Sequence, residues 1–384
     1  MIPYGKQNIS QADIDAVVEV LRSDWITQGP TVKRFEDQIT AYTGAKHACA
    51  VNSATSALHI ACLALGLGEG DILWTSPNSF VASANCGLYC GASVDFVDID
   101  PDTTNMSVSA LEQKLLQAQS AGRLPKVVIP VHFGGESCDM KAIHALSQQY
   151  GFRIIEDASH AIGARYDGKP VGDCRYSDIT VFSFHPVKII TTGEGGVATT
   201  ADDELAASLH RLRTHGITRD EGLYDVPADG PWDYRQVELG LNYRITDFQC
   251  ALGASQMLRL NEFVARRQQL AERYDRLLAD FAVNTPVRSD NAYSALHLYP
   301  VRLQVDDAAR RRVVFDRMRA SGIGVNVHYI PIHTQPYYRQ LGFSDGDFPH
   351  AEAWYRNCMS LPMFFDLTDS EQDQVVDTLR EAIA

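Results

Sequence analysis

The sequence predicts an α/β protein, in which a large domain built on a mostly parallel sheet with helices on both faces is followed by a smaller α+β domain. The chain has 384 residues, which is too long for one small core. Up to about residue 196, short runs rich in valine and isoleucine alternate with helical stretches, as in parallel sheets. Beyond that point the alternation stops. We therefore expect residues 1–260 to form the large domain and residues 261–384 the small one.

The large domain is predicted to begin with two helices. The first starts at Ser10, a residue type that caps helices, with Asp13 three positions later, and the second covers residues 31–42. Strand-like runs then lie at residues 47–51, 71–76, 93–99, 126–133, 152–157, 179–184 and 196–200. Helical stretches between them lie at residues 54–65, 79–89, 109–119 and 140–150. The stretch "GARYDGKP" (163–170) nearly matches a P-loop, but Pro170 replaces the required hydroxyl residue, so we expect a hairpin instead.

The remainder of the chain is more polar. A helix is expected from Asp202, a loop rich in Pro, Gly and Asp at residues 225–233, and a long helical region at residues 246–281. Two strand-like runs, 294–305 and 322–330, enclose a helix at 308–320, and the tail is helical from Asp369. The segment 221–232 matches no motif, and we expect it to be a surface insertion rather than a cover over a binding site.

Charge and composition argue against several classes of protein. A net charge of −14 disfavours nucleic acid or an anionic membrane as a partner. The longest apolar stretch, residues 57–67, is well short of the ~20 residues that cross a bilayer, and the N-terminus lacks the features of a signal peptide. None of the eight cysteines has CxxC spacing, which favours reduced thiols in a cytoplasmic protein. The histidines lack metal-ligand spacing, so no metal site is expected.

Chemically useful residues occur at the predicted carboxyl ends of strands, where open α/β sheets bind ligands. One strand ends at Asp157, and another is followed by Ser183 and, within "SFHPVKIITTGEGG", by Lys188. A lysine among small and apolar residues is costly unless it has a task. The stretch "NSATSAL" places small hydroxyl residues directly before a helix, and helix N-termini bind phosphate. Phe80 supplies an aromatic side chain at a third strand end.

Pyridoxal 5′-phosphate (PLP) is a cofactor that needs this set of groups together. It requires a lysine amine for a Schiff base, a carboxylate opposite its pyridinium nitrogen, a phosphate cradle and an aromatic face against its ring. Each residue alone has an ordinary structural explanation. Their joint occurrence at the strand ends of one domain favours a PLP site with Lys188 and Asp157 as its catalytic residues.

Five motifs resemble the DegT/DnrJ/StrS sugar aminotransferases, which are fold-type I PLP enzymes acting on nucleotide-linked keto-sugars. The motifs are "NSATSALH", "TSPNSFVASAN", "EDASHAIGA", "SFHPVKIITTGEGG" and "GLNYRITDFQCALG", and the similarity covers essentially the whole chain. Finer matches such as "KHAC" and "GVNVHY" resemble the branch of the pseudaminic acid pathway. That branch aminates C4 of a UDP-linked 4-keto-6-deoxy-N-acetylhexosamine. The resemblance implies a transaminase that uses L-glutamate and converts PLP to pyridoxamine 5′-phosphate (PMP) during turnover.

The resemblance also implies roles for individual residues. Lys188 binds the cofactor and moves the proton, Asp157 pairs with the pyridinium nitrogen, and His160 lies near the ring hydroxyl. Phe80 stacks on the ring. The phosphate is held by Ala54, Thr55, Ser183 and, from a neighbouring subunit, Asn242, so that the active sites of a homodimer are shared. The sugar nucleotide is expected to contact Tyr4, Asp24, Trp25, Ile26, Thr27, Asn326, Val327, His328 and Tyr329.

Three alternatives stay open at this point. The same chemistry could act on another nucleotide-linked 4-keto-sugar, such as a UDP-pentose or a GDP- or dTDP-hexose. A keto-sugar dehydratase of the same fold is disfavoured because that branch has histidine at the position of Lys188. A non-catalytic sensor of sugar nucleotides would be free to lose the lysine, which this chain retains. His185 receives no role, because its position varies in the family.

Overall fold

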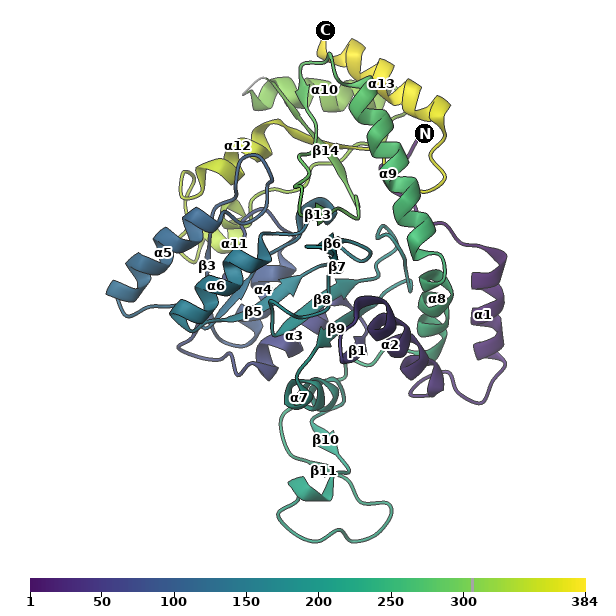
Figure 1. The fold of residues 1–384 in the computed structure, drawn as a ribbon, viewed down its shortest axis with the longest axis vertical. Coiled ribbons are helices and arrows are strands. Elements are labelled where there is room, and N and C mark those ends of the chain that lie inside the picture. Colours follow the sequence, from purple (N-terminus) through teal and green to yellow (C-terminus); the bar gives the residue numbers. More distant parts are fainter. Residues whose placement is uncertain (305–306) are drawn as a thin grey trace.

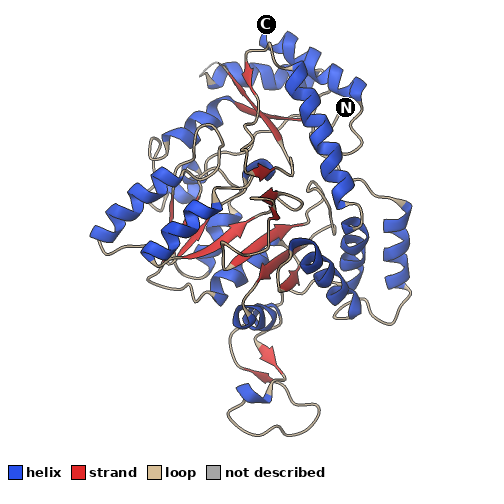
Figure 2. Ribbon diagram, viewed as in Figure 1, coloured by secondary structure: helices blue, strands red, loops and turns tan. Residues whose placement is uncertain are grey.

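The computed structural model describes residues 1–304 and 307–384, and its centre is a seven-stranded sheet with helices on both faces (Figures 1 and 2). The strand order is β1-β9-β8-β5-β4-β2-β3. Strand β9 runs antiparallel to β1 and β8, whereas the other neighbours are parallel. The strands are β1 His47–Val51, β2 Ile72–Thr75, β3 Ser93–Phe96, β4 Val127–Ile129, β5 Arg153–Asp157, β8 Ile179–Ser183 and β9 Gly196–Thr200. The predicted α/β fold is thereby confirmed.

Most of the helices begin at a residue whose side chain caps the first turn. At the first helix, the Ser10 hydroxyl accepts from the Asp13 backbone at 3.3 Å, and the Asp13 carboxylate accepts from the Ser10 backbone at 2.8 Å, which is the predicted cap. The helices are α1 Gln11–Leu21, α2 Pro30–Thr43, α3 Ala54–Ala64, α4 Ala82–Tyr89, α5 Val108–Ser120, α6 Met140–Tyr150, α7 Asp203–Arg213, α8 Asp247–Met257, α9 Leu260–Leu277, α10 Ala308–Ala320, α11 Pro336–Arg339, α12 Pro349–Asn357 and α13 Asp369–Ile383. In the described residues, none of these helices is long and apolar enough to span a bilayer.

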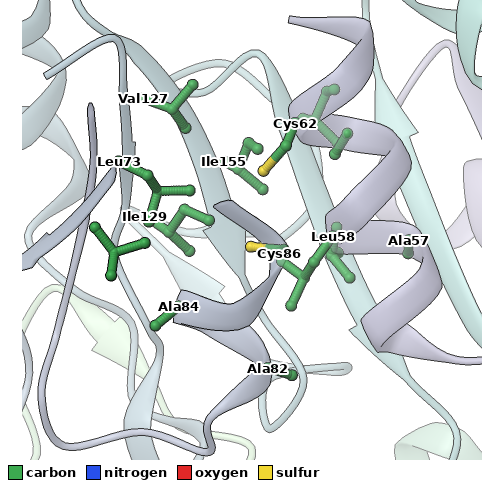
Figure 3. Packing of buried hydrophobic residues seen from close by; sticks show 14 of the residues in the cluster. Ala57, Leu58, Cys62, Leu73, Ala82, Ala84, Cys86, Val127, Ile129 and Ile155 are labelled. Carbon is green, nitrogen blue, oxygen red and sulfur yellow. The ribbon is translucent and has the colours of Figure 1, made fainter. Parts of the chain in front are cut away.

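The central sheet has an apolar core on each face because its side chains alternate. Ile129 and Ile155 pack with α3 and α4 on one face (Figure 3), whereas Val128 and Ile154 pack with α5 and α6 on the other. Burial on both faces explains the continuous valine and isoleucine runs of the sequence. It also fixes the sheet as a rigid base for residues at the strand ends.

A further core lies under the C-terminal part of the chain. Helices α9, α10 and α13 pack there around a three-stranded sheet of β12 Val283–Asn284, β14 Tyr299–Leu303 and β15 Cys358–Leu361. The N-terminal residue Ile2 joins this core and pairs with Ile323. By contrast, Leu298, Trp354 and neighbours of α12 pack on the core of the central sheet. The boundary at residue 260 stays a prediction.

Several boundary predictions need correction. Residues 322–330 form no strand, because only Ile323 and Asn326 make single bridges, to Ile2 and Ser360. The strand expected at 126–133 ends at Ile129, since Pro130 has no backbone N–H to continue the ladder. The helical region 246–281 divides into α8 and α9. The strand expected at 294–305 is limited to β14, and its residue 305 lies outside the described residues.

Two short hairpins complete the structure. The turn in "YDGK" joins β6 Arg165–Tyr166 to β7 Lys169–Pro170, as predicted, and β13 Ala292–Tyr293 adds a third strand. Strands β10 Ile217–Thr218 and β11 Arg235–Gln236 form the base of an arm that extends away from the body (Figure 1). The predicted insertion 221–232 forms the tip of this arm and does not cover the cavity of its own chain.

Candidate active site

A cavity of about 510 Å³ opens at the carboxyl ends of β5 and β8. Its walls come from the starts of α3 and α4, the segment after β8, the N-terminal segment and residues 326–329. The structure therefore brings together side chains that are widely separated along the chain. The predicted residues that line the cavity are Tyr4, Ala54, Thr55, Phe80, Asp157, His160, Ser183, Lys188, Asn326, Val327, His328 and Tyr329.

Lys188 extends into this cavity from the irregular segment that follows β8. Its backbone N–H donates to the His185 carbonyl at 2.9 Å, which tightens the turn that presents the side chain. Burial lowers the pKa of the Lys188 amine to about 8, although the negative charge of Asp157 acts in the opposite direction. No carboxylate of the described residues pairs with the amine within 4.0 Å. With this pKa, roughly a tenth of the amine is neutral and nucleophilic at pH 7, and about half is neutral at pH 8.

Asp157 is the last residue of β5 and is only 4% exposed. Its Oδ2 accepts a hydrogen bond of 2.6 Å from the Ser83 hydroxyl, which is itself 2.7 Å from the Ser79 hydroxyl. Its Oδ1 accepts from the backbone N–H of Ser159 at 3.1 Å. Helix α4 and the turn after β5 thus fix the carboxylate in one orientation, on the wall of the cavity that also holds Lys188.

The start of α3 forms an anion seat, which we define as Ala54, Thr55 and Ser183. The cap of α3 uses the Ser53 hydroxyl, which accepts from the Ser56 backbone at 3.1 Å. The backbone N–H groups of Ala54 and Thr55 have no acceptor within the described residues. Two free N–H groups at a helix start, beside hydroxyls of Thr55 and Ser183, suit a phosphate group.

Gly196 brings the strand and the helix of this seat into main-chain contact. It starts β9 and pairs with Ser183 of β8. A methyl group at this position would lie 2.5 Å from the Ala54 nitrogen, closer than real contacts allow. A glycine is therefore required for α3 to begin next to the end of the sheet.

His160 lies in the cavity wall as a neutral ring. The Gly134 backbone N–H donates to His160 Nδ1 at 3.3 Å, so the ring proton is on Nε2 and faces the Tyr329 hydroxyl at 3.1 Å. Burial, and then the positive charge of Lys188, hold the pKa of His160 well below its usual value. The His297 ring lies against it with a centroid distance of 4.4 Å. This network leaves the Tyr329 O–H free to donate to a bound group.

Residues 326–329 are held against the body by their backbone. The Tyr329 N–H donates to Asn78 Oδ1 at 3.2 Å, and the Trp354 indole donates to the His328 carbonyl at 2.9 Å. Burial, followed by the charge of Lys188, lowers the pKa of His328 to about 3, so this ring is also neutral. Tyr4 lies 5.7 Å from His328, centroid to centroid. The polar side chains that Tyr4 and residues 326–329 present to the cavity are thus uncharged near neutral pH.

Some predicted residues lie elsewhere in a single chain. Asn242 is exposed and bridges Thr214, away from the cavity. The segment Asp24, Trp25, Ile26 and Thr27 is exposed and leans on the start of α8, where the Ile26 carbonyl accepts from Asp247 at 3.0 Å. Phe80 lines the cavity but is 61% exposed, and His185 is exposed at its rim.

Several supporting residues were missed in the sequence. Ser79 and Ser83, which hold Asp157, are four residues apart at a predicted helix start, and this spacing places both on one face. Asn78 positions Tyr329 from the same segment. His297 gave no signal, because it lies in an apolar run typical of a buried strand. Among the described residues there is no group of three or more His, Cys, Asp and Glu side chains that could hold a metal ion.

Comparison with known proteins agrees with this geometry. The family model for DegT/DnrJ/EryC1/StrS aminotransferases matches residues 7–380. The chain belongs to this aminotransferase family. It is 38% identical, over all of its length and 97% of the relative, to the spore coat polysaccharide biosynthesis protein SpsC of Bacillus subtilis. It is 37% identical, over 99% of its length and 96% of the relative, to the UDP-4-amino-4,6-dideoxy-N-acetyl-beta-L-altrosamine transaminase of Campylobacter jejuni.

Solved structures give the same result. Spr1654 of Streptococcus pneumoniae in its PMP form has a TM-score of 0.91 and 30% identity, covering 100% of this chain and 99% of that chain. It has also been solved with PLP. Helicobacter pylori PseC, an aminotransferase involved in the biosynthesis of pseudoaminic acid, has a TM-score of 0.90 and 29% identity, covering 100% and 99%. The protein is a PLP-dependent sugar aminotransferase.

The cavity fits this cofactor. Lys188 supplies an amine with a lowered pKa, Asp157 supplies a fixed carboxylate, and the anion seat supplies free N–H donors. Phe80 adds an aromatic surface in the same cavity. These are the groups that PLP requires of a protein.

Proposed function

We propose that the protein transfers the amino group of L-glutamate to C4 of a UDP-linked 4-keto-6-deoxy-N-acetylhexosamine. The product would be UDP-4-amino-4,6-dideoxy-N-acetyl-β-L-altrosamine, an intermediate for pseudaminic acid. The single observation that supports the chemistry is the meeting of Lys188, Asp157 and the anion seat in one cavity. The substrate is supported by the Campylobacter jejuni relative and by the likeness to PseC.

Lys188 is the proposed proton carrier. PLP, when bound, carries the amino group between the two substrates and delocalises the charge left when a C–H bond breaks. Lys188 would hold the cofactor in the resting enzyme and, once its amine is free, take a proton from one carbon and return it to another. An amine with a pKa near 8 suits both directions of this transfer.

The other residues of the cavity would bind and orient. Asp157 would pair with the ring nitrogen, and Phe80 would cover one ring face. His160 would lie beside the ring hydroxyl, and the anion seat would bind the phosphate. Tyr4, Asn326, Val327, His328 and Tyr329 would contact the sugar nucleotide, since they line the same cavity.

A homodimer would complete the site. Asn242 and residues 24–27 lie outside the cavity of their own chain, which is consistent with a contribution to the site of a second copy. Asn242 would reach the phosphate, and Asp24, Trp25, Ile26 and Thr27 would reach the sugar nucleotide. The cytoplasmic location stays a prediction from the sequence.

The substrate is tested by absorption spectroscopy. The purified protein with PLP should show a visible band that bleaches with L-glutamate and returns with one sugar from a panel of UDP-, GDP- and dTDP-linked 4-keto-sugars. Recovery with the UDP-linked N-acetylhexosamine supports the proposal. Recovery only with a UDP-pentose or a GDP- or dTDP-hexose would keep the transaminase and replace the substrate. This alternative matters because SpsC, at 38% identity, bears a different name.

The shared site is tested by mixing two inactive variants. Lys188→Ala and Asn242→Ala chains, co-expressed, can form mixed dimers in which one site has both Lys188 and Asn242. Activity should return to about a quarter of the wild-type value, because half the dimers are mixed and each has one intact site. If Asn242→Ala alone stays active, or mixing restores nothing, Asn242 does not act across the interface.

A further inference from the structure

A cluster of three cysteines lies between α3 and α4, outside the PLP cavity. Cys62 is on α3, Cys86 is on α4, and Cys90 caps the end of α4. Figure 3 shows the Cys62 and Cys86 sulfurs pointing into the space between the two helices. The Cys62 thiol hydrogen-bonds with both Cys86 and Cys90. Cys62 and Cys86 are fully buried, whereas Cys90 is only half-buried, so one thiol of the cluster meets solvent.

Aromatic and imidazole groups complete the surroundings of Cys90. His59 lies one turn before Cys62 on α3 and hydrogen-bonds with Cys90. Its Nδ1 is 3.0 Å from the Tyr243 hydroxyl, so a proton from the tyrosine leaves the other ring nitrogen to donate to the sulfur. Tyr89 packs edge-on against the same imidazole at 5.4 Å. His59 therefore donates to the Cys90 sulfur, and Tyr243 and Tyr89 hold the His59 ring in place.

This environment favours the thiolate of Cys90 over its thiol. The hydrogen bond from Cys62 is the largest influence and lowers the pKa of Cys90 to about 6; burial opposes it and His59 adds to it. Burial and the neighbouring sulfurs raise the pKa of Cys62 well above its ordinary value. Burial also raises the pKa of Cys49, Cys174, Cys250 and Cys358. A solvent-accessible thiolate beside a buried thiol distinguishes this pair from those four.

The cluster is connected to the cofactor site through three elements. Helix α3 carries both Cys62 and, at its start, Ala54 and Thr55 of the anion seat. Helix α4 ends at Cys90, and its Ser83 donates to Asp157. Tyr243 adjoins Asn242 and its carbonyl accepts from the Asn52 backbone, directly before the cap of α3. A change in the spacing of α3 and α4 therefore reaches the groups that hold PLP.

We propose that Cys90 and Cys62 form an oxidation site, at which a hydroperoxide converts the two thiols to a disulfide and so weakens the PLP site. The Cys90 thiolate attacks the peroxide: a sulfur–oxygen bond forms, the oxygen–oxygen bond breaks, and the leaving oxygen takes a proton to become an alcohol or water. The Cys62 sulfur then attacks Cys90. The disulfide forms, the sulfur–oxygen bond breaks, and hydroxide leaves as water with the Cys62 proton. Two sulfurs lose two electrons in total, and the peroxide gains them.

The test treats the PLP-loaded protein with a few equivalents of tert-butyl hydroperoxide at pH 7. The intact mass should fall by about 2 Da, and unreduced digests should contain a peptide that joins Cys62 to Cys90. Iodoacetamide should label Cys90 at least about tenfold faster than any other cysteine before oxidation, and not after it. The mass readout does not depend on the proposed function. The PLP absorption band should shrink with crosslinking and return with dithiothreitol.

Variants assign the roles within the pair. Cys90→Ser should abolish the rapid oxidation. Cys62→Ala removes both the second thiol and the strongest donor to Cys90, so oxidation should be slower and should stop at a sulfenic acid on Cys90, which dimedone traps with a mass increase. Cys86→Ala is the matched control in the same cluster and should still crosslink, as should Cys250→Ala in α8. Loss of the crosslink in Cys86→Ala would overturn the assignment, and so would equal labelling of all cysteines. A crosslink that leaves the PLP band unchanged would overturn the connection to the site.

Discussion

Strand β5 ends with two neighbouring carboxylates, Glu156 and Asp157. The first is surrounded by the packed interior, whereas the second faces the cavity. Glu156 points to one face of the sheet, where its Oε2 lies 2.7 Å from His132 Nε2 and its Oε1 accepts from Thr180 at 2.9 Å. The Cys138 N–H donates to the other nitrogen of His132, so that ring gives its only proton to Glu156. Asp157 points to the cavity and accepts from Ser83 and Ser159.

Burial does not distinguish the two residues, since Glu156 is 5% and Asp157 is 4% exposed. The two carboxylates differ in the groups that surround them. Burial would raise the pKa of Glu156, but donors from His132, Ser177 and Thr180 lower it, and all of them belong to the packed interior. Asp157 instead acts on Lys188, whose pKa it raises without forming an ion pair within 4.0 Å. Glu156 is thus held entirely by the packed interior, whereas Asp157 faces a cavity and influences the Lys188 amine.

Replacement of Lys188 should have the largest effect on activity. Lys188→Ala should lower the transamination rate by at least ~10³-fold, because the proton carrier is lost, and the visible PLP band should disappear. Lys114→Ala is the matched control: Lys114 is also largely buried with a lowered pKa, but it pairs with Asp95 at 2.7 Å. It should lose stability and keep activity. Equal activity loss in both variants would contradict the comparison.

Replacement of either carboxylate should have the next largest effect, on kcat in one case and on stability in the other. Asp157→Asn should lower kcat by about 10²-fold or more while the unfolding free energy changes little. Glu156→Gln should keep kcat within about threefold of the wild type but lose about 3 kcal/mol of unfolding free energy, since it breaks a buried network. Denaturant titrations and steady-state kinetics on both variants separate the effects.

The stability difference should depend on pH with a defined sign. The folded-state pKa of Glu156 lies below 4.5, its ordinary value, so its stabilisation is complete above about pH 4.5 and is lost as pH falls through the folded-state pKa. Wild type and Glu156→Gln should therefore converge on acidification. A difference that grows below pH 4.5 would contradict the network.

Capture of PLP by the cofactor-free protein should report the Lys188 amine. Its second-order rate constant should rise about tenfold per pH unit and level off above pH 8, where the amine is neutral. Asp157→Asn should move the plateau to lower pH, because it removes a charge that raises this pKa. Glu156→Gln should not move it. Absorption stopped-flow measures all three proteins, and an unshifted plateau in Asp157→Asn would show that Asp157 does not act on the lysine.

The smallest effects concern the donors to each carboxylate. Ser83→Ala removes a 2.6 Å hydrogen bond to Asp157 and should lower kcat about tenfold, with little change in KM. Thr180→Val removes a 2.9 Å hydrogen bond to Glu156 and should lower unfolding free energy by about 1 kcal/mol without a change in kcat. A kcat effect of Thr180→Val as large as that of Ser83→Ala would erase the distinction.

The sequence was informative where interactions are local. Valine and isoleucine runs predicted the strands because burial on both faces leaves a continuous apolar pattern, and Asp157 and Lys188 stood out at strand ends. The strand expected at 322–330 was wrong because its register depends on Ile2 and Ser360, which are distant along the chain. His297 was missed for the same reason, since its contact with His160 exists only after folding. The roles of Asn242 and residues 24–27 stay predictions, because they depend on a second chain.

The close backbone contact at Gly196 limits how the cofactor site of this enzyme can be redesigned. Its missing side chain lets the main chain of β9 touch the start of α3, with only 2.5 Å available for any added carbon. A larger residue there would push the helix outward and widen the gap between Ala54 and Ser183, whatever the chemistry of the new side chain. The spacing of the anion seat, where we propose that phosphate binds, is therefore set by the contact between two main chains and not by the choice of side chain. Redesign for bulkier or smaller cofactors would have to move a whole helix.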